Sequence, residues 1–189
     1  MTKIDELSEL LKQANSFSDD GKFEDAISLF NELTRRVPEK AIFWCLLGDT
    51  YRSFGDHAAA VHAYETALKK DPDHQLSQLA LAQICMDVGE LERAEGWLMT
   101  ALLTPNNHNM VYTLLGSLRG KQERWKESEE YCSKAIEADP LYEEAYLFLG
   151  ISFMRQGRVA EANRAIRRAL EIDPEYEDAK RALKTLRQF

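Results

Sequence analysis

The sequence contains few of the residues that break helices or form tight turns. Only five prolines and nine glycines occur among 189 residues, too few for the many turns of an all-β domain. No run approaches 18 consecutive apolar residues, so we expect no membrane-spanning helix. The N-terminus has no basic start followed by an apolar run, so we expect no secretory signal. These absences favour a helical protein with a cytoplasmic location and no membrane partner.

Cysteine is also scarce, and its positions argue against a metal or disulfide framework. Cys45, Cys85 and Cys132 form no CxxC or Cys/His spacing, and an odd number of thiols without a secretory signal is typical of reduced, buried cysteines. His74 and His108 hold equivalent places, each at the end of an expected helix. Helix packing would separate them by about 10 Å, too far to share a metal with bonds of about 2.1 Å. We therefore expect no metal and no cofactor.

Positive charge is outweighed by negative charge. The chain has 24 Lys and Arg against 32 Asp and Glu, a net charge of -8 at pH 7. Proteins that wrap nucleic acid neutralise phosphates with basic residues, so we expect no nucleic-acid partner. Residues 155–189 are nonetheless net basic, at +3. Their arginine cluster predicts weak head-to-tail self-association or an anionic partner, unless it only forms a solvated face: Arg158, Arg164, Arg167 and Arg168.

What the sequence does have is a period of 34 residues. The segment 41–74 carries a tryptophan, a Leu-Gly pair, a tyrosine, an alanine, an aromatic residue and a proline in fixed order: Trp44, Leu47, Gly48, Tyr51, Ala60, Tyr64 and Pro72. The five prolines lie 34, 33, 35 and 34 residues apart: Pro38, Pro72, Pro105, Pro140 and Pro174. Shifted by 34 residues the chain aligns with itself over five units, 7–40, 41–74, 75–108, 109–142 and 143–176, with one further helix over 177–189.

This pattern resembles the tetratricopeptide repeat (TPR) family. The resemblance implies an all-α fold, a TPR superhelix (α-solenoid) of five helix-turn-helix repeats plus a C-terminal capping helix, forming a single TPR domain over residues 1–189. Glycines are expected where paired helices approach closely, at Gly48, Gly116 and Gly150. Others are expected to end the first helices, where a left-handed residue is needed: Gly21, Gly55, Gly89 and Gly157.

The unit 109–142 departs most from the pattern. It has Arg119 where a large apolar residue usually lies, Gly120 inside the first helix, Glu123 in place of the turn glycine, and Ser128 in place of alanine. A glycine inside a helix costs about 1 kcal/mol relative to alanine. We therefore expect the first helix of this unit to be the least stable of the inner helices. The departure marks either a hinge or partner-specific notch, or simple sequence drift.

The resemblance also implies a concave groove lined by the first helix of each repeat. Carried over by register, the partner-binding residues are Leu11, Asn15, Ile42, Cys45, Asp49, Arg52, Leu76, Leu79, Gln83, Met86, Met110, Thr113, Leu147, Ile151 and Met154. The same register places Ser117, Gly120, Lys121 and Arg155 in the groove. The many Leu, Ile and Met residues favour an amphipathic helix or an extended peptide as the occupant. Alternatively, Leu76, Leu79 and Leu147 pack between adjacent helices, or the protein's own terminus fills the groove.

The sequence therefore predicts a non-catalytic scaffold or adaptor that binds a protein or peptide partner. No arrangement of nucleophile, base or paired carboxylates stands out from the repeat register, so we expect no enzymatic activity. The alternative is a chaperone of a secreted client, because residues 41–98 are distantly similar to the small acidic TPR chaperones of type III secretion.

Overall fold

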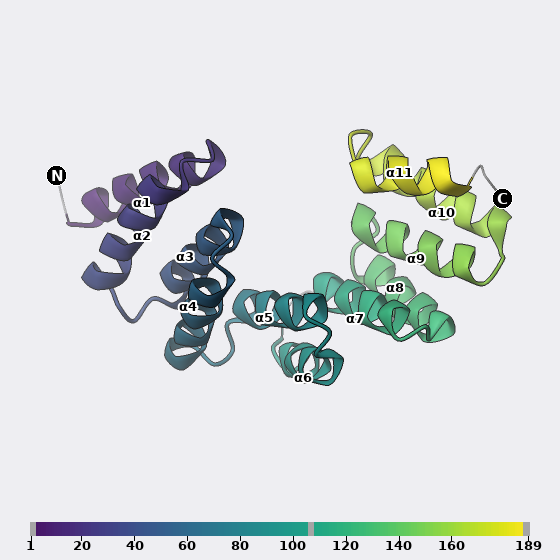
Figure 1. The fold of residues 1–189 in the computed structure, drawn as a ribbon, viewed down its shortest axis with the longest axis horizontal. Helices are drawn as coiled ribbons and strands as arrows, with labels where there is room; N and C mark the ends of the chain where they lie inside the picture. Colours follow the sequence, from purple (N-terminus) through teal and green to yellow (C-terminus); the bar gives the residue numbers. More distant parts are fainter. Residues whose placement is uncertain (1–2, 106–107, 187–189) are drawn as a thin grey trace. The chain divides into compact units, whose positions relative to one another are not determined.

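The computed structural model describes residues 3–105 and 108–186, and over these ranges it contains eleven helices and no strand (Figure 1). The predicted all-α class is therefore confirmed. The chain divides into two compact units, Met1–Leu81 (unit 1) and Ala82–Phe189 (unit 2), with the boundary inside one helix, α5. The single TPR domain over residues 1–189 stays a prediction.

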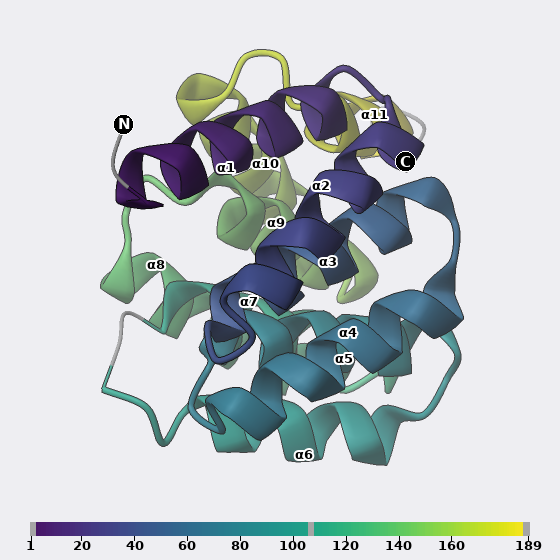
Figure 2. The ribbon, with the colours of Figure 1, turned by 90° about the vertical axis from the view of Figure 1, so that its left-hand side faces the viewer.

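Unit 1 contains α1 (Lys3–Asp19), α2 (Phe23–Arg36), α3 (Ala41–Phe54), α4 (His57–Lys70) and the start of α5 (Gln75–Asp87). From α1 to α4, successive helices pack in pairs, α1 with α2, α2 with α3 and α3 with α4 (Figure 2). Their apolar faces meet in a core that includes Phe30, Leu33 and Phe43. The close approach expected at Gly48 is confirmed, because a Cβ there would lie 2.7 Å from the Tyr64 ring.

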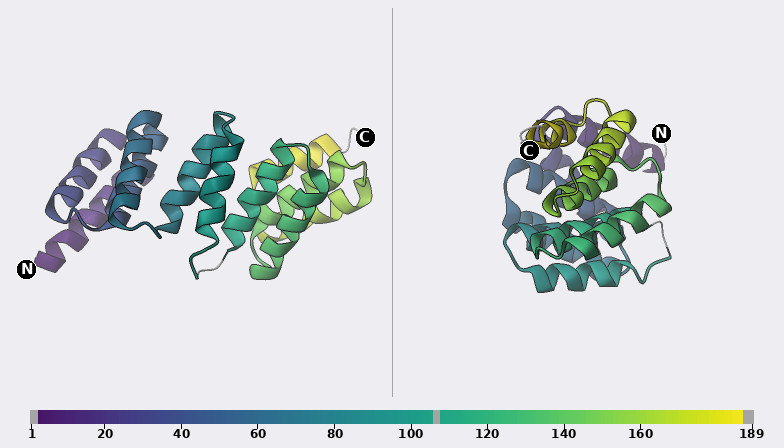
Figure 3. Two further views of the ribbon diagram at one scale, coloured as in Figure 1. Left: turned by 90° about the horizontal axis from the view of Figure 1, so that it is seen from below. Right: turned by 90° about the vertical axis from the view of Figure 1, so that its right-hand side faces the viewer.

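Unit 2 contains the rest of α5, then α6 (Leu91–Ala101), α7 (Asn109–Lys121), α8 (Trp125–Ala138), α9 (Glu143–Arg155), α10 (Val159–Ile172) and α11 (Glu177–Leu186). The helices from α7 to α10 lie side by side in succession (Figures 1 and 3). Helix α11 covers α9 and α10, with Ala179 and Leu186 buried in a core shared with Leu147 and Ile166. This agrees with the expected capping helix.

The turns inside the hairpins follow the expected pattern, with one exception. The four turn glycines adopt left-handed backbone, with φ of +75°, +94°, +83° and +75°: Gly21, Gly55, Gly89 and Gly157. Among the described residues, Glu123 is the one non-glycine with positive φ, at +60°. It follows α7 at the place where the other repeats have glycine. Helix α7 itself runs through Gly120 without a break, and its expected low stability stays a prediction.

Two expectations about helix ends need correction. His74 and His108 were expected at the ends of second helices, but they lie directly before α5 and α7. The cause is that α4 and α6 stop earlier, at Lys70 and Ala101, ahead of the prolines that cannot continue a helix. Across residues 3–105 and 108–186, no three His, Cys, Asp or Glu side chains gather as metal ligands. No helix in these ranges is long and apolar enough to cross a membrane.

Candidate functional site

The predicted groove residues differ widely in exposure. Five are exposed: Asn15, Ile42, Arg52, Leu76 and Met110. Five are half-buried: Leu11, Asp49, Gln83, Ile151 and Met154. The other five are buried, and this corrects the expectation that they line an open surface: Cys45, Leu79, Met86, Thr113 and Leu147. The binding role of the remaining residues stays a prediction.

The burial has identifiable causes. Leu147 belongs to the core formed by α9, α10 and α11, and the Thr113 hydroxyl donates to the Asn109 carbonyl at 2.9 Å inside α7. Burial raises the pKa of the Cys45 thiol to about 11, so this side chain is neutral at pH 7. Leu79 and Leu147 are buried, as expected if they pack between adjacent helices, whereas Leu76 is 47% exposed. Register alone does not tell whether a neighbouring helix covers a residue.

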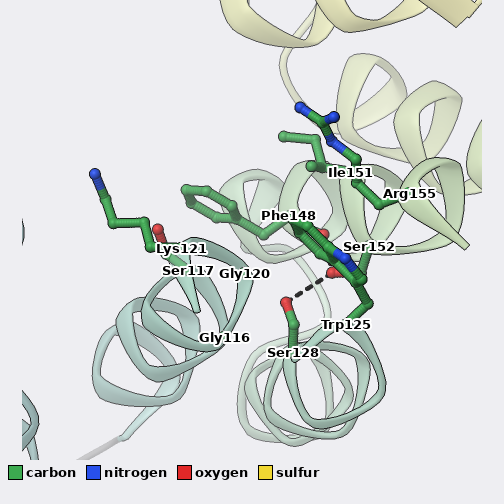
Figure 4. Close-up of a pocket in the computed structure, with 10 residues that line it drawn as sticks. All are labelled: Gly116, Ser117, Gly120, Lys121, Trp125, Ser128, Phe148, Ile151, Ser152 and Arg155. Carbon is green, nitrogen blue, oxygen red and sulfur yellow. Dashed lines mark hydrogen bonds between the residues drawn. The ribbon is translucent and has the colours of Figure 1, made fainter. Parts of the chain in front are cut away.

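A concave site that includes predicted groove residues lies in unit 2, among α7, α8 and α9. It is a pocket of about 260 Å³ that we call the α7–α9 pocket (Figure 4). Its lining residues are Gly116, Ser117, Gly120, Lys121, Trp125, Ser128, Phe148, Ile151, Ser152 and Arg155. Half of them are residues that the register placed in the groove: Ser117, Gly120, Lys121, Ile151 and Arg155. The others come from α8 and from neighbouring positions on α7 and α9.

Two glycines of α7 form one side of the pocket. A Cβ on Gly116 would lie 2.6 Å from the Cys132 sulfur, so glycine there brings α7 and α8 into close contact. A Cβ on Gly120 would lie 3.2 Å from Cζ3 of Trp125. The fifth repeat has Met154 at the place of Gly120. The Trp125 ring therefore packs closely against Gly120, and a larger side chain there would require the ring to move.

The hydroxyl groups of Ser128 and Ser152, which line the pocket, form hydrogen bonds within the protein. The Ser152 hydroxyl donates to the Phe148 carbonyl at 2.9 Å. Because that donation uses its hydrogen, the 2.7 Å contact between the two serine oxygens is a donation from Ser128 to Ser152 (Figure 4). Ser128, the residue that replaces the usual alanine, is buried and bonded in this way. The pocket therefore presents mainly apolar surface, from Trp125 and Ile151 among others.

The rim of the pocket is positively charged. Lys121 at the end of α7 and Arg155 at the end of α9 are both exposed, and no acidic residue lines the pocket. The Arg155 guanidinium lies 5.7 Å from the centroid of the Trp125 ring, a cation–π contact. Within the described part of the chain, neither cation takes part in an ion pair; the nearby acid Glu127 pairs with Arg124 instead, at 2.6 Å.

Arg119 is a feature that register reasoning flagged but could not explain. Its side chain is only 6% exposed, and its guanidinium bonds both oxygens of Glu95 on α6, at 2.6 and 3.0 Å. It also lies 3.4 Å from Glu127 on α8. The hydrogen bond with Glu95 raises the pKa of Arg119 and lowers the pKa of Glu95. Arg119 therefore replaces an apolar contact with a charged link among α6, α7 and α8.

The basic end of the chain is partly neutralised. Arg158 pairs with Glu129 at 2.7 Å and also with Glu161, and Arg168 pairs with Glu171 at 2.8 Å. Such exposed pairs are worth little in stability, but they reduce the charge offered to an anionic partner. Head-to-tail self-association stays a prediction.

The fold places the chain in a class. Successive helical hairpins with a 34-residue repeat and glycine at the helix contacts define a TPR protein, and the predicted TPR solenoid is confirmed by solved structures of similar fold. A thermophilic TPR protein of Thermus thermophilus is 17% identical, with 97% of this chain and 100% of that chain covered, at a TM-score of 0.83. PilW, a type IV pilus biogenesis factor, is 14% identical, with 100% and 92% covered, at a TM-score of 0.80. At these identities the likeness is one of fold.

The family follows from the sequence. The chain belongs to the family of the cilia and flagella-associated protein 70 C-terminal domain, whose family model matches residues 6–188. The APC/C hetero-tetramer Cut9–Hcn1 also contains a similar fold, 15% identical over 97% of this chain and 40% of that chain, at a TM-score of 0.81. No curated protein matches the sequence.

Proposed function

We propose that this chain is a non-catalytic adaptor that binds a protein partner through the first-helix face of unit 2. The observation that carries the proposal is the α7–α9 pocket, which is open, mainly apolar and rimmed by two cations without acidic partners. Repeat proteins of stacked helical hairpins use such extended surfaces for binding. Cut9–Hcn1, a structural neighbour, is an assembly of more than one protein, which is consistent with this role.

The binding surface is defined here as Ser117, Gly120 and Lys121 on α7 together with Ile151 and Arg155 on α9. Exposed apolar surface beside charge is typical of a protein-binding site. A chaperone role for a secreted client is the second function that the sequence predicted, and no contact within the described residues favours it over an adaptor. The cytoplasmic location also stays a prediction.

The experiment is an unbiased selection of peptides from a random display library against the whole chain, followed by titration of the selected peptides into ¹⁵N-labelled protein. We expect the selected peptides to shift the amide signals of Ser117 and Ile151. Ser117→Trp, which places a bulky side chain at the pocket, should abolish binding. Glu130→Trp is the matched control, because Glu130 is exposed on α8 outside the pocket.

Two outcomes would contradict the proposal. One is that no peptide is enriched above the level seen with an unrelated helical protein. The other is that the enriched peptides shift signals of α8 and α10 only and bind Ser117→Trp as well as wild type.

A further inference from the structure

The α7–α9 pocket has room for one side chain. Its volume of about 260 Å³ is below the roughly 300–1,000 Å³ of small-molecule pockets. A cavity of about 150 Å³ is already large enough for benzene. A single leucine, isoleucine or phenylalanine side chain therefore fits.

The inner surface of the pocket favours an apolar side chain. The Trp125 ring, Phe148 and Ile151 face the same space (Figure 4). The hydroxyls of Ser128 and Ser152 donate within the protein, so neither is free to donate to a polar occupant. A polar side chain moved into this space would lose hydrogen bonds to water without replacing them, which is unfavourable.

The rim of the pocket favours negative charge in the partner. Figure 4 shows Lys121 on one side of Phe148 and Arg155 on the other. The pocket lining carries these two cations and no acid, although the chain as a whole has a net charge of -8. Of the acids close in sequence, Glu127 pairs with Arg124 and Glu129 with Arg158, and Glu123 is exposed but does not line the pocket. A local positive rim in an acidic chain selects against basic segments and orients acidic ones.

We propose that the pocket binds one apolar side chain of an acidic protein segment, with carboxylates on both sides of that residue placed near Lys121 and Arg155. This deepens the proposed function and depends on it. The apolar side chain supplies affinity through burial against Trp125, and the flanking carboxylates supply orientation and partner choice. Gly120 is the specificity-determining residue, because a side chain there would displace the Trp125 ring against which the anchor packs.

The test uses a set of synthetic peptides and the ¹⁵N-labelled whole chain. The first peptide is Ser-Asp-Glu-Ser-Leu-Ser-Glu-Asp-Ser. The second replaces leucine by serine, and the third replaces every acid by lysine. The signals to follow are the backbone amides of Gly116 and Gly120 and the indole N–H of Trp125. We expect the first peptide to shift all three signals and to bind about tenfold more tightly than either of the others.

Charge reversal on the protein tests the rim. The double variant Lys121→Glu/Arg155→Glu should weaken binding of the acidic leucine peptide about tenfold, because both exposed cations become repulsive. The variant Lys126→Glu/Arg164→Glu makes the same change in net charge at exposed residues outside the pocket and should bind within about twofold of wild type. Equal loss in both variants would show that net charge alone matters and would overturn the proposal.

Failure of this inference and failure of the proposed function are distinguishable. If the acidic leucine peptide shifts none of the three signals while library-selected peptides still bind at Ser117 and Ile151, the adaptor function stands and the inferred partner chemistry is wrong. If the library-selected peptides also bind elsewhere, the adaptor function itself is wrong. A shift of Gly116 and Gly120 with protein concentration alone would identify a second copy of the chain as the occupant and would also overturn the inference.

Discussion

The hairpins α7–α8 and α9–α10 lie in the same unit and share their helix contact but differ on their surface. In each, a glycine of the first helix meets a side chain of the second: a Cβ on Gly116 would lie 2.6 Å from the Cys132 sulfur, and one on Gly150 would lie 2.5 Å from Cγ1 of Ile166. Both second helices begin directly after a short turn. The buried contact that joins two helices is thus kept in both repeats.

The two hairpins differ at three nearby places. The fourth repeat has Arg119, Gly120 and Glu123 where the fifth has an apolar residue, a methionine and the turn glycine. Each change has a separate consequence. Arg119 forms an ion pair with α6, Gly120 lines the pocket, and Glu123 adopts a left-handed backbone conformation. The comparison shows that positions outside the helix contact differ between repeats while the contact itself is kept.

The largest effect should come from the shared contact. We expect Gly116→Ala and Gly150→Ala each to lower the free energy of unfolding by about 3 kcal/mol, because the new methyl group overlaps a buried side chain and approaches a backbone carbonyl. Urea unfolding measures this. Gly96→Ala is the control: no atom lies within 4 Å of a Cβ at Gly96, so a gain of about 0.5–1 kcal/mol is expected there. If Gly116→Ala and Gly150→Ala both kept the wild-type free energy of unfolding, the close helix contact would be contradicted.

The buried Arg119 should have the next largest effect. Arg119→Ala leaves Glu95 without its partner and removes packing, and we expect a loss of about 2 kcal/mol. This is less than for a fully buried pair because Glu95 and Glu127 are 35% and 40% exposed. Arg119→Met keeps the apolar stem and should lose only about 1 kcal/mol. If alanine and methionine cost the same in urea unfolding, packing of the apolar stem has no role, and if methionine costs nothing, the charged link has none.

The turns should give a smaller effect of opposite sign in the two hairpins. Glu123→Gly should stabilise the protein by about 1 kcal/mol, because glycine adopts positive φ without steric cost. Gly157→Ala should destabilise it by about 1 kcal/mol for the same reason. Thermal unfolding of both variants measures the two changes in stability. A stabilising effect of alanine at Gly157 would show that the left-handed turn is not required.

The smallest effect is a pH dependence of the ion pair between Glu95 on α6 and Arg119 on α7. The Arg119 guanidinium holds the pKa of Glu95 below its ordinary value of 4.5. A lowered folded-state pKa contributes stability above pH 4.5 that is lost as pH falls through the folded pKa. We therefore expect wild type to exceed Glu95→Gln in unfolding free energy at pH 7 and the difference to shrink below pH 4.5. A difference that stays constant with pH would contradict this link.

Much of the fold could be predicted from the repeat, and less of the site. Register correctly assigned Gly48, Gly116 and Gly150 to the helix contacts, because the helix period fixes which face a residue occupies. It could not predict the burial of Met86 or Thr113, which depends on the tertiary neighbours of each helix.

The pocket was partly predicted for the same reason. Ser117, Gly120 and Ile151 lie in the expected groove, whereas the departure of the fourth repeat from the pattern is equally open to a hinge, a notch or sequence drift. Trp125 was missed because it belongs to a second helix, and Phe148 because its register position lies beside the groove. The partner of Arg119 could have been sought as an acid on the preceding second helix, where Glu95 lies, but sequence spacing does not fix that contact.

The most direct test of the central claim is the affinity of a library-selected peptide for Gly120→Met, measured by calorimetry. This variant gives the fourth repeat the residue of the fifth and fills the α7–α9 pocket. We expect binding to weaken more than about tenfold while urea unfolding confirms a folded protein, and Glu130→Met, outside the pocket, to bind as wild type. Wild-type affinity in a folded Gly120→Met variant would contradict the claim that the α7–α9 pocket is the binding site.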